Sequence, residues 1–161
     1  MITTADLNKI KDTLLENMKE NFKNDGEIYP VVIVITPNGD MHLIATPYSN
    51  QQEKNEMMNE VMTMCKNLDA IALFLINEAW IKKIKVEDYN KFTKEMDDKN
   101  KRISDYDDKE EVAMMMFETK LHCETIMFEL DKVNRQLINR KGGMTKGGNF
   151  ANILSPIINN N

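Results

Sequence analysis

The sequence contains few of the residues from which catalytic and metal sites are most often built. Its 161 residues include two cysteines, two histidines and one tryptophan. Neither His42 nor His122 lies within ligand spacing of a cysteine, so we expect no metal site. Cys65 and Cys123 are far apart in a chain without secretory context, and we expect small buried thiols rather than a disulfide. No recognisable catalytic motif occurs, which favours a non-enzymatic protein without a cofactor.

Long hydrophobic runs are also missing. The longest, at 31–35 and 70–76, are far shorter than the roughly 20 apolar residues of a membrane helix. The first six residues have neither the basic region nor the apolar region of a signal peptide. We therefore expect a cytoplasmic protein that does not bind membranes. A hydrophobic content of 42% with 29% charged residues indicates a soluble globular chain.

Two segments have the apolar periodicity of amphipathic helices. The first carries Leu7, Ile10, Leu14, Met18 and Phe22 at three- and four-residue steps. Thr3 or Thr4 can cap its start, and the Asn-Asp-Gly sequence at 24–26 predicts its end. A second helix is predicted after residue 50, where Ser49 with Gln52 or Asn50 with Glu53 can form a capping box.

Five segments have the composition of strands. Residues 31–35 are continuously apolar and predict an interior strand, joined by a turn at 36–40 to a partner at 41–46. Further strands are predicted at 71–76, 111–118 and 123–130, the last nearer an edge of the sheet. The sequence therefore predicts an α+β domain over residues 1–130, with a roughly five-stranded, mainly antiparallel sheet and two main helices.

The segment between the third and fourth strands is dominated by charged residues. A short exposed helix is predicted over 87–96, followed by a loop through 97–110. Asp105, Asp107 and Asp108 resemble oxygen ligands for a divalent cation. Their spacing lacks the glycine and the distal glutamate of a calcium loop, so we interpret them as solvated turn acids.

The last 31 residues form a basic, glycine-containing arm. They carry five basic residues against the single acid Asp131, a charge of 5 − 1 = +4, so the other 130 residues hold −9 of the total −5. The binding residues predicted in this arm are Lys132, Arg135, Arg140, Lys141, Lys146 and Phe150. The paired glycines lack the order of a phosphate-binding loop. The arm could track a nucleic acid, carry apolar residues 150–158 onto its own core or onto an acidic partner protein, or be a plain solvated tail.

A second candidate surface site lies at the predicted end of the third strand. Glu78 and the sole tryptophan, Trp80, follow the apolar run, and strand ends often present functional side chains. A tryptophan that closes the edge of a core explains the same pattern. Glu78 could also act as an acid or base with His42 or His122, if their strands are neighbours.

Several short motifs resemble a widespread group of small uncharacterised proteins encoded in phages and bacterial genomes. They are Tyr29-Pro30-Val31, the strand end Glu78-Ala79-Trp80, and Asp107-Asp108-Lys109-Glu110 before a hairpin. The resemblance spans roughly residues 20–130 and implies an α+β fold and a phage or mobile-element origin, in the host cytoplasm or the virion. It implies no activity.

The sequence thus favours a non-enzymatic accessory protein that binds another protein through its C-terminal arm. A nucleic-acid-associated protein that uses the basic tail is the first alternative, and a small enzyme of unknown reaction is the second. The composition leaves the oligomeric state open, because apolar edge strands and methionines fit both self-association and core burial.

Overall fold

The computed structural model of this chain describes residues 2–140 and residue 154. Within these residues the helices are α1 (Thr4–Asp25), α2 (Gln51–Asn67) and α3 (Tyr89–Lys99), with short 3-10 turns η1 (Val86–Asp88) and η2 (Ile103–Asp105). The strands are β1 (Val31–Ile35), β2 (Met41–Ala45), β3 (Ala72–Ile81), β4 (Glu110–Thr119), β5 (Cys123–Asp131) and β6 (Gln136–Asn139). They form one antiparallel sheet in the order β2-β1-β3-β4-β5-β6, which confirms the predicted α+β class and adds a sixth strand. None of the described helices has the length and apolar character needed to span a membrane.

Both main helices begin, and α1 also ends, at residues that the sequence singles out. The Thr3 hydroxyl accepts the Asp6 amide while the Asp6 carboxylate accepts the Thr3 amide, a complete capping box at the start of α1. Gly26 ends that helix in the left-handed conformation with φ of 77°, where a side chain would be strained. Asn50 caps α2 through the amide of Glu53, the second of the two predicted alternatives.

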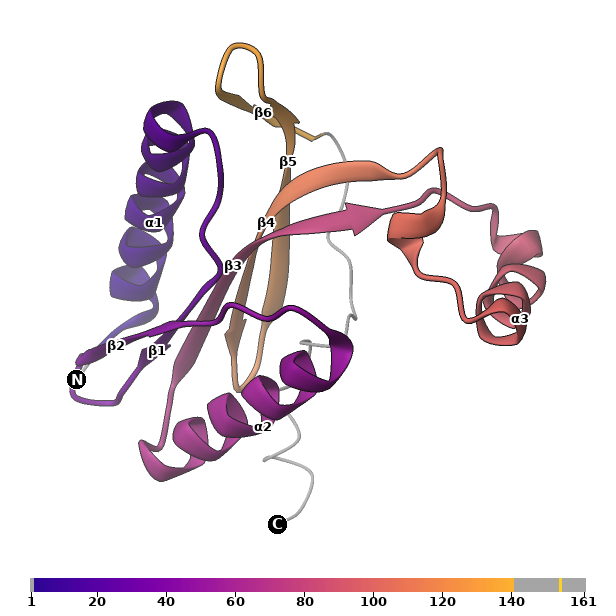
Figure 1. The fold of residues 1–161 in the computed structure, drawn as a ribbon. Coiled ribbons are helices and arrows are strands. Elements are labelled where there is room, and N and C mark those ends of the chain that lie inside the picture. Colours follow the sequence, from indigo (N-terminus) through magenta and orange to yellow (C-terminus); the bar gives the residue numbers. More distant parts are fainter. Residues whose placement is uncertain (1, 141–153, 155–161) are drawn as a thin grey trace.

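The two main helices cover opposite faces of the sheet (Figure 1). Side chains of a strand alternate between the faces, so the apolar residues of β1 and β3 serve both layers. On the α1 face, Phe22 packs with Ile33, Phe74 and Phe117. The rings of Phe74 and Phe117 stack with their centres 4.7 Å apart. The α2 face packs Val61 and Cys65 against Val32, Val34, Leu73 and Leu75. This two-sided burial explains why β1 is continuously apolar and confirms its interior position.

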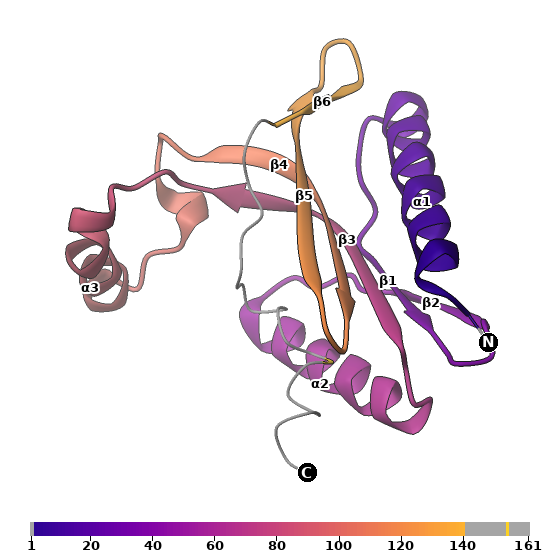
Figure 2. The ribbon, with the colours of Figure 1, turned by 180° about the vertical axis from the view of Figure 1, so that it is seen from behind.

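β3 and β4 are twice as long as β1, and their last two residue pairs, Trp80–Glu111 and Ile81–Glu110, lie beyond the pairing of β4 with β5. Each has ten residues and the two pair along their whole length, whereas β1 has five and pairs with β3 only through Ile76. Figures 1 and 2 show the paired strands continuing past the body to carry α3. The predicted end of the third strand at residue 76 is therefore wrong, because Asn77 and Glu78 end the apolar run but not the pairing.

β6 pairs with β5 in residues that the sequence analysis assigned to the arm. Asp131 pairs with Gln136 and Phe128 with Asn139, so the sheet extends beyond residue 130. The Asp131 carboxylate accepts the backbone amides of Val133 and Asn134 at 3.1 and 3.0 Å, which fixes the turn between the strands. Residues 131–139 therefore belong to a hairpin of the sheet.

The described residue beyond the hairpin belongs to the core. Leu154 is fully buried in the α2-face cluster, and its backbone amide donates to Oε1 of the buried Glu118 at 2.9 Å. At least this apolar residue of the predicted docking segment thus packs on its own chain. Cys65 is buried and Cys123 half-buried in the same part of the molecule, and both are free thiols, as predicted.

The hairpin predicts where the chain can be shortened. A chain ending at Arg140 should be more stable than one ending at Leu130 by about 2 kcal/mol, because only the first keeps the β5–β6 pairing and its arginine contacts. Urea unfolding of both truncations beside the full chain measures the difference. Equal stability of the two truncations would show that β6 contributes nothing to the fold.

Candidate functional site

Three of the basic residues predicted to bind a partner hold the C-terminal hairpin in place instead. The Lys132 ammonium lies 2.7 Å from the Glu111 carboxylate, and Arg140 donates to Glu110 at 2.6 Å. Arg135 donates to the backbone carbonyl of Asn24 at 2.6 Å, at the C-terminal end of α1 where a cation is favoured. These side chains are therefore not a free basic surface. Lys141, Lys146 and Phe150 lie outside the described residues.

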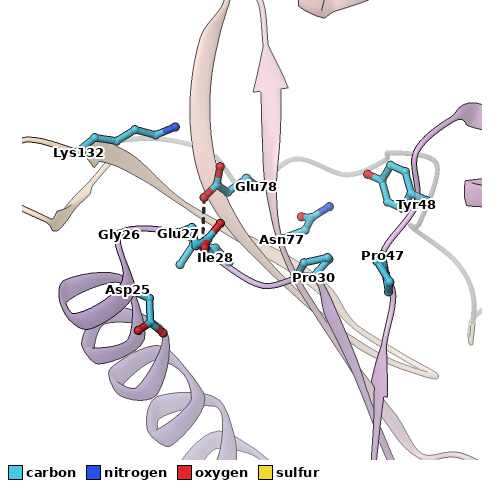
Figure 3. A pocket seen from close by; sticks show the side chains of 10 residues that line it. All are labelled: Asp25, Gly26, Glu27, Ile28, Pro30, Pro47, Tyr48, Asn77, Glu78 and Lys132. Atoms are coloured by element: carbon cyan, nitrogen blue, oxygen red, sulfur yellow. Dashed lines mark hydrogen bonds between the residues drawn. The ribbon is translucent and has the colours of Figure 1, made fainter.

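A cavity of about 550 Å³ opens beside the start of β1, where β3 continues beyond its pairing with Val31. Its walls come from the α1–β1 connection, the β2–α2 connection, β3 and the β5–β6 turn (Figure 3). Glu78 and Lys132, which the sequence analysis selected separately, both line it. The lining residues are Asp25, Gly26, Glu27, Ile28, Pro30, Pro47, Tyr48, Asn77, Glu78 and Lys132.

Glu78 is the chemically unusual group of this cavity. Its Oε1 accepts the backbone amide of Ile28 at 2.9 Å, drawn as the dashed line in Figure 3. Burial raises the pKa of the Glu78 carboxyl above 4.5, and a hydrogen bond and charge repulsion from Glu111 raise it further. The Ile28 amide and the Lys132 cation oppose these effects without cancelling them. Glu78 and Glu111 thus form a carboxyl pair bridged to the hairpin by Lys132.

Asn77 faces the opposite side of β3 from Glu78, since neighbouring strand residues alternate. It is buried, and its side-chain oxygen has no hydrogen-bond partner among the described residues. A buried polar atom left unpaired costs about 1–3 kcal/mol. The branching of β3 away from β1 therefore carries an energetic cost at the rim of this cavity.

The proposed acid and base partners of Glu78 lie elsewhere. His42 on β2 pairs with Val34, which pairs with Leu73, five residues along β3 from Glu78. His122 follows Thr119, whose partner on β3 is Ala72. Five residues of strand span roughly 16 Å, so neither imidazole can exchange a proton with this carboxyl. The structure does not assemble the predicted acid/base group.

Trp80 lies two residues beyond Glu78 on the same face of β3 and is 44% exposed. The Lys109 ammonium lies 5.3 Å from the centre of its ring, a cation–π contact. Trp80 therefore does not close the edge of a core, the alternative to a functional role that its sequence position suggested. It stands on the outer ribbon, the two pairs Trp80–Glu111 and Ile81–Glu110 of β3 and β4 that lie beyond the pairing with β5.

The outer ribbon carries residues 82–109, which we call the β3–β4 module. The Lys82 side chain, which forms an ion pair with Asp108, lies over the rings of Tyr106 and Phe92, at 5.0 and 5.9 Å from their centres. The two rings contact each other at 5.2 Å, and Lys101 lies over Tyr106 at 4.8 Å. No residue of α3 is fully buried. These few contacts, rather than an apolar core, fold the module.

The acids of the module serve this local packing. Asp108 pairs with Lys82, and Asp105 accepts the backbone amide of Arg102 at 2.7 Å. Within the described residues, no group of three or more histidine, cysteine or acidic side chains is arranged to hold a metal ion. The interpretation of these aspartates as turn acids fits their contacts.

Comparison with protein-family models, with curated proteins and with solved structures finds no match for this chain. The candidate functional site is therefore defined by its geometry. It consists of the cavity at the branch point of β3, the outer ribbon with Trp80, and the β3–β4 module.

The Glu78 environment predicts a specific dependence of stability on pH. Since its pKa is raised in the folded state, the folded protein binds more protons than the unfolded chain, and the free energy of unfolding falls as pH rises from 4.5 through the folded pKa. Glu78→Gln removes the titrating carboxyl and with it this fall in the free energy of unfolding. The variant should therefore gain stability relative to the wild type between pH 4.5 and neutral pH, measured by urea unfolding.

Asp131→Asn provides a control of opposite sign. Hydrogen bonds from Asn134 and Val133 lower the pKa of Asp131, so its carboxylate stabilises the fold above its unfolded pKa and this stabilisation is lost as pH falls. The variant should be less stable than the wild type, and this difference in the free energy of unfolding should be largest at neutral pH. A pH-independent difference for Glu78→Gln would contradict the assignment.

Tyr106 provides a matched pair of substitutions in the β3–β4 module. Its hydroxyl is buried without a hydrogen-bond partner in the described part of the chain, so Tyr106→Phe should keep or raise stability by up to about 1 kcal/mol. Tyr106→Ala removes the ring that Phe92, Lys82 and Lys101 contact, and should unfold the module alone. Amide hydrogen exchange should then rise in α3 and stay unchanged in α1. Protected α3 amides in Tyr106→Ala would show that other contacts fold the module.

Proposed function

We propose that this protein is a non-enzymatic accessory protein that binds another protein, and that the outer ribbon and the β3–β4 module form its binding surface. The proposal moves the contact away from the C-terminal arm, because Lys132, Arg135 and Arg140 are engaged within the chain. The observation that carries it is the exposure of large apolar side chains on an element that projects from the body (Figure 2).

Three of these side chains follow each other along the ribbon and the start of the module. Trp80 is 44% exposed, Val86 is 93% exposed and Tyr89 is more than half exposed. Tryptophan and tyrosine are the residues most enriched at the energetic centres of protein interfaces. An extended element that keeps them in solvent has no evident role in folding of the body. Their exposure supports a docking role.

The charge of the module supports a protein rather than a nucleic acid as partner. Residues 82–109 contain nine basic and eight acidic residues, a net charge of 9 − 8 = +1. Nucleic-acid surfaces are typically strongly basic, since they must neutralise phosphates. A dense mixture of both charges around exposed aromatic residues is instead typical of the rim of a protein interface.

The origin of the protein forms part of the proposal. The resemblance of its short motifs to small phage and bacterial proteins supports a phage or mobile-element origin. The partner would then be a host or virion protein met in the cytoplasm. A docking protein without its own chemistry fits the absence of an assembled acid/base group at Glu78 within the described residues.

Site-specific photo-crosslinking in the host cell tests this function. A benzophenone amino acid replaces Val86 in the module or Val133 in the β5–β6 turn, two valines with exposures of 93% and 92%. The Val86 position should give a discrete cross-linked protein and the Val133 position should not. Adding Trp80→Ala should weaken the Val86 product several-fold, since the ring lies on the proposed surface.

The purified partner then allows a direct measurement. Trp80 is the sole tryptophan, so its fluorescence reports only on the outer ribbon, and partner binding should shift its emission to shorter wavelength. Cross-linking from Val133 but not from Val86, or a partner that binds without changing this emission, would overturn the proposed surface.

A further inference from the structure

The strand at one edge of the sheet lacks the features by which proteins protect sheet edges. β2 is the outermost strand next to β1, and its residues are Met41, His42, Leu43, Ile44 and Ala45. It contains no lysine, acid, proline or glycine, and its register with β1 runs without a bulge. Charged residues, prolines and bulges are the usual means of blocking edge-to-edge pairing. Nothing in the sequence of β2 prevents a further strand from adding to it.

The hydrogen-bond pattern shows which groups the edge leaves available. Thr46 donates to the Pro30 carbonyl at 3.0 Å, and Thr36 donates to the Asp40 carbonyl at 3.1 Å, both in the β1–β2 register. Even-numbered residues of β2 therefore direct their backbone groups toward β1. Since these groups alternate along a strand, the odd-numbered residues direct theirs outward. No strand among the described residues pairs with this edge, which thus offers three amides and three carbonyls, those of Met41, Leu43 and Ala45.

The side chains of the same three residues are exposed on the α1 face of the sheet. Leu43 is 68% exposed, and Met41 and Ala45 are also exposed. Beside Leu43 lies a small apolar cavity of about 200 Å³ between α1 and the sheet. Its walls include Leu14, Met18, Ile28, Ile33 and Ile76. Apolar side chains and unpaired backbone groups therefore coincide at this edge.

We propose that β2 is a self-association edge, which pairs antiparallel with β2 of a second copy around a two-fold axis at Leu43. In this register Leu43 faces Leu43 of the second copy and Met41 faces Ala45. All three outward residues then fall in hydrogen-bonded pairs, so six backbone hydrogen bonds use every free group of both edges. The two sheets become continuous, and the exposed leucines pack against each other over the α1 face.

Charge selects a second copy as the occupant. Each chain carries a net charge of −5, so two copies can meet only where no like charges face each other. At β2 the first charged residue, Asp40, would lie opposite Thr46 of the second copy. The β2 edge can therefore pair with its own copy without bringing like charges together.

Sedimentation equilibrium over a wide concentration series tests this association. The full chain should form a dimer, and Leu43→Lys should be monomeric, because it places two lysines against each other on the two-fold axis. Leu121→Lys is the matched control, since Leu121 is 91% exposed in the β4–β5 connection, and it should remain dimeric. Leu43 is exposed, so the substitution should leave the circular dichroism spectrum and folding unchanged.

Amide hydrogen exchange tests the backbone pairing directly. The amides of Met41, Leu43 and Ala45 should become protected as the wild-type concentration rises, whereas those of His42 and Ile44 should be protected at all concentrations. Ala45→Pro removes one outward amide without touching the β1 pairing and should weaken the dimer at least tenfold.

Three results would overturn the proposal: a monomeric wild type, a dimer that survives Leu43→Lys, or open-ended assemblies instead of dimers. Open-ended assemblies would indicate head-to-tail pairing of β2 with β6. This inference is independent of the proposed function, since β2 and the β3–β4 module are separate surfaces. Cross-linking from Val86 should persist in the Leu43→Lys variant whether or not the dimer forms.

Discussion

The pairing of β3 with β4 over ten residues organises the whole molecule, because β1 accompanies β3 for only half of that length. The inner halves of the two strands share the core with α1 and α2. Beyond Ile76, β3 has only β4 as a partner, and β4 pairs with β5 as far as Val112. The last two pairs, Trp80–Glu111 and Ile81–Glu110, therefore leave the body as a two-stranded ribbon, which is marginally stable alone. The β3–β4 module at its tip and the cavity at its base, with the unpaired Asn77 oxygen, are direct results of this mismatch.

The parts of the fold that the sequence predicts well are those set by local chemistry. Capping by Thr3 and Asn50, the stop at Gly26 and the apolar run of β1 each depend on residues adjacent in the chain. The second half of β3 was missed because its residues after Asn77 are half-buried or exposed and have no continuous apolar pattern. β6 was missed because it is short, mostly exposed and followed by glycines. The sequence feature that could have predicted β6 is the turn at Asp131, but its polar residues look like those of any exposed loop.

The candidate site shows a different limit. Glu78, Trp80 and Lys132 were selected from the sequence, and the structure places Glu78 and Lys132 in one cavity and Trp80 on the adjoining ribbon. The charge sum over residues 131–161 predicted free cations, yet three of them contact groups from distant parts of the chain, Asn24, Glu110 and Glu111. Such pairing depends on strand order, which a local charge count does not contain. The exposed residues of the module likewise suggest a binding surface only once the ribbon is seen to project from the body, and the local sequence does not specify that projection.

The burial of Cys65 has a practical consequence for the chemistry of this chain. Desolvation, with the nearby Glu118 carboxylate, raises the pKa of the Cys65 thiol to about 11, and the pKa of Cys123 is raised for the same reasons. Because the thiolate is the reactive form, neither side chain is a ready nucleophile at neutral pH. Modification of Cys65 by a thiol reagent requires α2 to separate from the sheet. The rate at which a thiol reagent labels Cys65 therefore reports how often α2 separates from the sheet.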